Sequence, residues 1–134
     1  MGQEKINRTD EAVIRAIGAF GGGIAGSGSV CGILLGAVAL VSSLYSRGNL
    51  TERENPRLWG LSHKLVRQFD NLTEGYGGSN CRDIARLDWQ NRDAVKDYYT
   101  NPDSRRKYCI ALVADFSLFL GQLLEKEMAR EDKS

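Results

Sequence analysis

Three cysteines lie close to the predicted starts of three separate helices. Ser and Asn residues, which favour helix N-termini, come shortly before Cys31, Cys81 and Cys109. The first turn of a helix exposes unpaired N–H groups and a partial positive charge, and both favour a thiolate. The thiolate is the form that binds metal or reacts. We therefore expect the three thiols to converge on a redox or metal site, although three buried and inert cysteines would give the same pattern.

The composition limits the classes of function. A chain of 134 residues is expected to form one domain, with residues 1–9 as a flexible N-terminus and residues 10–134 as a single helical domain. A formal net charge of +1 gives no electrostatic reason to expect nucleic acid as a partner. Three cysteines, an odd number without a CxxC motif, exclude a closed disulfide framework in a lone chain. The polar start does not resemble a secretion signal, so we expect a cytoplasmic protein.

One apolar segment raises the question of a membrane span. Residues 30–44 are apolar apart from two serines, but this stretch is shorter than the roughly 20 residues that a spanning helix needs. We expect a helix buried at the centre of a bundle, and no membrane span.

The apolar spacing predicts an all-α fold, an irregular helical bundle of about three long and two short helices. The long helices are expected at about 29–45, 56–72 and 104–128, and the short ones at 11–19 and 81–87. No segment alternates with the period of a strand. The polar and aromatic segment that follows the second short helix reads as a long loop with a helical turn.

The third and last helices carry the clearest apolar stripes, with residues three and four positions apart. Their central members are predicted to be buried and to meet across the two helices: Leu61, Leu65, Phe69, Leu112, Phe116 and Leu120.

A glycine-rich segment precedes Cys31. It does not match a dinucleotide fingerprint, because the glycine after Gly28 comes one position late and no strand precedes it, and it lacks the Lys of a phosphate loop. Glycine also lets a backbone approach another group closely. The glycines predicted to form the site are Gly21, Gly22, Gly23, Gly28, Gly32 and Gly36.

His63 is the only histidine and is a candidate fourth metal ligand beside three thiolates. Its position off the apolar stripe also fits a solvated residue on the helix flank. No Ser-His-Asp arrangement or carboxylate pair supports hydrolase chemistry.

Several segments together resemble the C-GCAxxG-C-C family, putative redox-active proteins of bacteria and archaea. The resemblance rests on Phe20-Gly21-Gly22-Gly23, on Cys31-Gly32 with Gly36, on Tyr76-Gly77 before Cys81-Arg82, and on the late Cys109. It covers about residues 12–125. It implies a cysteine-thiolate site built from Cys31, Cys81 and Cys109 that can bind an iron–sulfur cluster or another metal.

Two departures from the family pattern matter. Ile33 replaces the motif's Ala, and the family's first cysteine has no counterpart here. The missing ligand could come from His63, a carboxylate, water or a second subunit. Three hypotheses remain: a redox or cluster-binding protein, a thiol–disulfide protein, and a non-catalytic binding or structural module that has lost the site. The sequence leaves open whether the chain is an enzyme, whether it forms a homo-oligomer, and which redox partner it meets.

Overall fold

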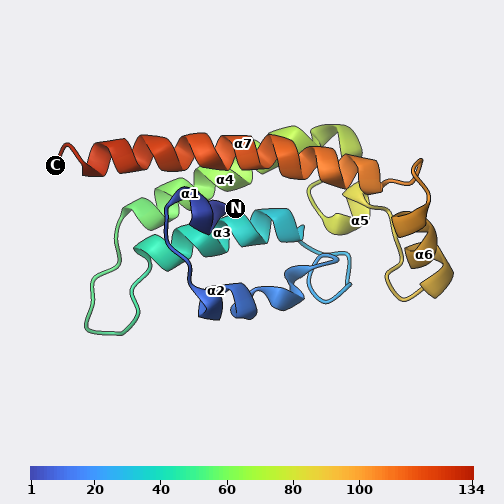
Figure 1. Cartoon of the computed structure of the whole chain (residues 1–134), viewed down its shortest axis with the longest axis horizontal. Coiled ribbons are helices and arrows are strands. Elements are labelled where there is room, and N and C mark those ends of the chain that lie inside the picture. Colours follow the sequence, from blue (N-terminus) through green and yellow to red (C-terminus); the bar gives the residue numbers. More distant parts are fainter.

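The computed structural model describes all 134 residues and confirms the all-α prediction (Figure 1). It contains seven α-helices and no strand. The helices are α1 (Gly2–Lys5), α2 (Glu11–Ala16), α3 (Gly32–Tyr45), α4 (Arg57–Thr73), α5 (Cys81–Ile84), α6 (Arg92–Thr100) and α7 (Arg106–Glu131). Two 3₁₀ helices cover Gly18–Phe20 and Glu74–Tyr76.

The core lies between α3, α4 and α7. The three helices contribute most of one continuous cluster of 16 buried residues. All six residues predicted to be central belong to it, and Leu65 and Phe69 are fully buried. The rings of Phe69 and Phe116 meet edge to face with centroids 5.0 Å apart. The prediction that the two stripes meet is therefore confirmed.

Several boundaries differ from the expected ones. Helix α2 stops at Ala16 and is followed by a 3₁₀ turn, and α3 begins at Gly32 because Cys31 has an extended backbone and forms its N-cap. The segment 88–101 contains α6, which the sequence did not reveal. The Asn91 side chain accepts a hydrogen bond from the amide of Ala94 and caps α6. The first residues form α1, which packs on α3 and α7 (Figure 1).

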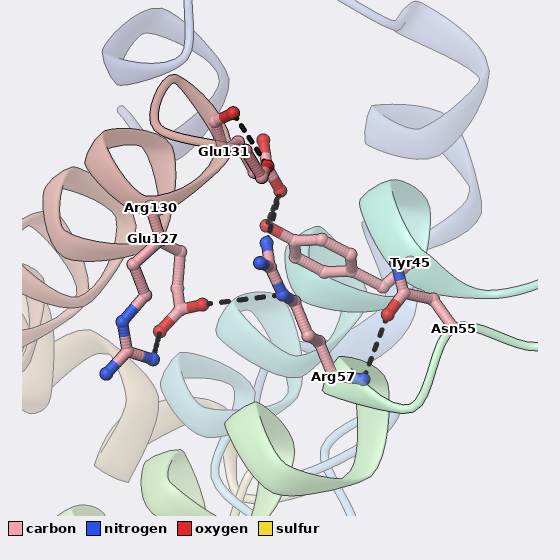
Figure 2. Close-up of polar contacts among 7 residues, drawn as sticks. Tyr45, Asn55, Arg57, Glu127, Arg130 and Glu131 are labelled. Atoms are coloured by element: carbon pink, nitrogen blue, oxygen red, sulfur yellow. Dashed lines mark hydrogen bonds and ion pairs between the residues drawn. The ribbon is translucent and has the colours of Figure 1, made fainter.

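A polar cluster holds the end of α7 against α3 and α4 (Figure 2). Glu127 is 2% exposed and pairs with Arg130 at 3.0 Å and with Arg57 at 3.9 Å. Arg57 also pairs with Glu131 at 2.9 Å, and the Tyr45 hydroxyl donates to the same carboxylate oxygen. A buried carboxylate is tolerated only when it is paired and hydrogen-bonded, and these contacts meet that need.

Helix α7 is long and apolar enough to cross a membrane by length and composition alone. One such helix is weak evidence for a span, because core helices of soluble proteins meet the same criterion. In the apolar 18-residue stretch of α7 that meets this criterion, only 22% is buried inside the chain. The apolar helix singled out from the sequence, α3, has 14 residues.

Replacing Leu65 by Ala should lower the free energy of unfolding by about 2–5 kcal/mol, because the side chain is fully buried and the cavity cannot close completely. Urea unfolding monitored by circular dichroism measures this loss. The neighbouring Val66 is 38% exposed, so Val66→Ala is the matched control and should change stability by about 0.5 kcal/mol or less. Equal losses in both variants would contradict the assignment of the buried face.

Candidate cysteine site

Backbone hydrogen bonds join the glycine-rich loop to the start of α5. The amide of Cys81 donates to the carbonyl oxygen of Ser29 at 2.7 Å, and the amide of Arg82 donates to that of Gly28 at 3.0 Å. The Arg82 side chain adds a hydrogen bond to the same Gly28 carbonyl at 2.9 Å. These contacts place Cys81 beside the loop that leads into Cys31.

The loop itself has a left-handed backbone. Residues 22–26 all have positive φ, between 51° and 71°. Three of the five are glycines, which adopt this region readily, whereas Ile24 and Ala25 do so only when their surroundings enforce it. The glycine content is therefore explained by the path of the chain.

Close approach accounts for some of the predicted site glycines. A Cβ at Gly23 would lie 2.6 Å from the Cβ of Cys81, and one at Gly22 would lie 3.2 Å from the indole of Trp89. A Cβ at Gly32 would come within 2.7 Å of a carbonyl oxygen, and one at Gly28 within 3.3 Å of the Arg82 Cβ.

The other two predicted site glycines differ. A Cβ added at Gly21 or at Gly36 would meet nothing within 4 Å, so close packing does not require a glycine at either position. Gly36 and Gly32 instead line an apolar cavity of about 330 Å³ between α1, α2, α3 and α7, and no cysteine lines this cavity.

The cysteines come from three parts of the chain. Cys31 is the N-cap of α3 and belongs to the main core, whereas Cys81 opens α5 and belongs to a small cluster with Ala85 and Tyr98. Cys109, in the first turn of α7, packs against both clusters. All three are free thiols, and Cys109 is the least buried.

Burial and neighbouring charges raise the pKa of two of the three thiols. Burial raises the pKa of Cys31, and the neighbouring Cys81 and Cys109 raise it further. Burial also raises the pKa of Cys81, and Cys109 again adds to the effect. The helix starts were expected to favour thiolates. Backbone N–H groups near Cys31 act in that direction, but desolvation outweighs them.

Two aromatic side chains supply hydrogen-bond donors beside the thiols. The indole Nε1 of Trp89 is buried and has no acceptor in full hydrogen-bond geometry. Hydrogen bonding from Trp89 to the thiolate nevertheless lowers the pKa of Cys81, against the larger effect of burial. A neutral thiol is a weak acceptor and a thiolate a strong one, so this N–H favours the ionised form of Cys81.

Tyr98 lies next to Trp89, with ring centroids 5.5 Å apart. Burial raises the pKa of Tyr98, and hydrogen bonding with Cys109 raises it further. The phenol therefore stays protonated and can donate to Cys109. Both aromatic residues are visible in the sequence, but their segment reads there as a loop and gives them no role. Tyr98 reaches the cysteines from α6, and Trp89 reaches them from the turn before α6, where it packs against Gly22 and Gly26.

The side chains of this chain do not form a metal-ligand set. No group of three or more His, Cys, Asp or Glu side chains is arranged to hold a metal ion. His63 is exposed on α4 and belongs to no such group. Binding of a metal or an iron–sulfur cluster by Cys31, Cys81 and Cys109 therefore stays a prediction.

The chain matches the family model described as "putative redox-active protein (C_GCAxxG_C_C)" over residues 1–123. It belongs to this family, which confirms the resemblance seen in the sequence. Neither a curated relative nor a solved structure matches the chain.

From the close approach of Gly23 to Cys81 we predict that a larger residue at position 23 lowers the free energy of unfolding. Gly23→Ala should cost at least about 1–2 kcal/mol for the left-handed backbone alone, and the collision with the Cys81 Cβ adds to this cost. Gly21→Ala is the matched control, because Gly21 has φ −59° and open space around it. Thermal unfolding of both variants provides the test, and similar melting temperatures would argue against the close approach.

The raised thiol pKa values predict how stability depends on pH. In the unfolded chain, cysteines ionise near pH 8.5, whereas Cys31 and Cys81 ionise at higher pH in the folded protein. Above about pH 8.5 the unfolded chain holds fewer protons, so the free energy of unfolding should fall as pH rises. Urea titrations across this range measure the slope. Cys31→Ala should make it shallower, and an unchanged slope would contradict the burial effect.

Proposed function

We propose that this protein is a thiol redox protein that exchanges two electrons with disulfide-containing partners through Cys81 and Cys109. Membership of a redox-active family supports this general class. The observation that carries the specific proposal is the buried, unpaired N–H of Trp89 beside Cys81. An unsatisfied buried donor costs stability, and its use here is to stabilise a thiolate that forms transiently.

The exposure of the two cysteines indicates which thiol reacts first with the partner disulfide. Cys109 is the most accessible thiol, so its thiolate attacks one sulfur of the partner disulfide. A mixed disulfide forms and the first partner sulfur leaves as a thiolate. Cys81 then loses its proton to water, and its thiolate attacks the Cys109 sulfur and releases the second partner thiolate. The partner disulfide gains two electrons, and after protonation two thiols are released. The Cys81–Cys109 pair becomes a disulfide.

The aromatic residues assist different steps. Trp89 stabilises the Cys81 thiolate in the second step, when this buried sulfur must ionise. Tyr98 can donate a hydrogen bond to the Cys109 sulfur, both before attack and when Cys109 is the leaving group in the reverse direction. Free thiols suit a reducing cytoplasmic compartment, which is the location that we propose.

The test is thiol counting in glutathione redox buffers of increasing oxidation. The wild-type protein should lose two free thiols per chain together, and peptide mapping should link Cys81 to Cys109. Cys81→Ala and Cys109→Ala should each abolish the paired loss, whereas Cys31→Ala should retain it. Three thiols that stay reduced in every buffer would favour a non-catalytic helical module. Stoichiometric iron and sulfide in anaerobically purified protein would favour the cluster hypothesis instead.

A second measurement tests the role of Trp89. Trp89→Phe should raise the pKa of Cys81 and slow its alkylation at neutral pH by about tenfold or more, because a hydrogen bond to a charged group contributes about 1.5–3 kcal/mol. Iodoacetamide labelling of Cys81, followed by mass spectrometry over a pH series, gives this pKa. Trp59→Phe is the matched control, because Trp59 is 60% exposed and donates to Glu54. A lower melting temperature of Trp89→Phe with an unchanged Cys81 pKa would mean that Trp89 only packs.

A further inference from the structure

Helix α7 carries a largely exposed face, which α1 borders only at its C-terminal half, where Gly2 and Lys5 share a surface pocket with Leu118 and Gly121. Figure 1 shows α7 running the length of the molecule along one side. Two large apolar side chains stand out from it, Ile110 at 55% and Leu118 at 65% exposure. Between Lys107 and Glu125 the helix contains a single charged residue, Asp115. This apolar face indicates an interaction surface.

The residues along the middle of this face have a heptad spacing. They follow each other at intervals of four, three, four, three and four: Lys107, Ala111, Ala114, Leu118, Gly121 and Glu125. Such spacing is the signature of a helix that packs lengthwise against another helix. All six are exposed except Gly121, which is partly exposed. We call this set the α7 seam.

The α7 seam is self-complementary when read in opposite directions. If a second copy of the helix lies antiparallel with its midpoint opposite Phe116, Lys107 meets Glu125 of the partner copy, and Glu125 meets the partner copy's Lys107. In the same register Ala114 faces Leu118 of the partner copy, so that a small side chain leaves room for a large one. A two-fold interface requires this reciprocity, in which each residue of a pair contacts the other across the axis.

Gly121 supplies an independent reason for a partner. Glycine destabilises a helix interior by roughly 0.8–1 kcal/mol relative to alanine, and nothing in this chain lies within 4 Å of a Cβ at this position. The monomer therefore gives no reason for a glycine here. In the antiparallel register Gly121 faces Ala111, and two small residues allow the helices to approach closely.

We propose that two copies of this chain associate as an antiparallel homodimer through the α7 seam. The paired charges select the antiparallel direction, since a parallel arrangement would place Lys107 against Lys107 and Glu125 against Glu125. The contact extends over about 27 Å of helix, at 1.5 Å per residue. Glu125 also pairs with Lys5 of its own chain, and its two carboxylate oxygens can accept both lysines.

The first test is a charge swap followed by sedimentation equilibrium at low salt. The wild-type protein should be a dimer. Lys107→Glu and Glu125→Lys should each raise the dissociation constant of the dimer tenfold or more. Each change replaces an attractive pair by a like-charge pair, and the two-fold symmetry places this pair at two positions in the interface. The double variant, Lys107→Glu with Glu125→Lys, should restore it. Lys5→Gln controls for the pair within the chain and should leave dimerisation unchanged.

The second test keeps the fold intact while blocking the α7 seam. Gly121→Leu places a large side chain in a position that is open in the monomer, so the variant should fold normally by circular dichroism yet sediment as a monomer. A monomeric wild-type protein would overturn the proposal, as would a dimer that ignores both the charge reversals and Gly121→Leu. A wild-type monomer that cosediments with phosphatidylcholine vesicles would assign the apolar face to a membrane instead.

Discussion

The seating of Cys81 against the glycine-rich loop is the constraint on which the candidate site depends. The hydrogen bond from the Cys81 amide to Ser29 fixes the loop and α5 together, and Gly23 makes room for the Cys81 Cβ. Cys31 and Cys81 are 50 positions apart in the sequence, and this contact joins the segments that carry them. The left-handed path of residues 22–26 is what brings the loop back to that point. A strained backbone segment beside reactive side chains is a common feature of functional sites.

The same contact helps to explain the raised pKa of Cys81. Packing the loop over Cys81 removes water, and the loss of water raises the pKa more than the nearby donors lower it. Helix caps are visible in a sequence, whereas desolvation depends on packing that forms only in the folded chain. This is why the expectation of readily formed thiolates was wrong for Cys31 and Cys81. The Trp89 N–H partly offsets the desolvation cost of the charged Cys81 thiolate and has little effect on the neutral thiol.

The helices with a regular apolar spacing could be predicted from the sequence. The apolar stripes of α4 and α7 identified the core because burial repeats every three or four residues along the helix. Helix α6 was missed because its helix-forming signal is one Asn cap and one buried aromatic, Tyr98, in a polar segment. Local patterns also could not reveal that Trp89 meets Cys81, since that contact depends on how the turn before α6 packs on the glycine-rich loop. The family resemblance correctly grouped the chain, while the grouping of the three cysteines in one site remains a prediction.

Helix α7 connects the core, the thiols and the outer surface of the molecule. Its buried side closes the core, its first turn holds Cys109, and its outer side carries the α7 seam. In addition to the apolar stripe that faces the core, α7 therefore carries apolar residues such as Ile110 and Leu118 on its outer side. By length and composition the same helix is also a candidate membrane span, but a span would not require a lysine and a glutamate placed symmetrically about Phe116. Two copies packed through the α7 seam would also hold α7 straight near Cys109, so that the accessible thiol is presented on a rigid support rather than on a frayed helix end.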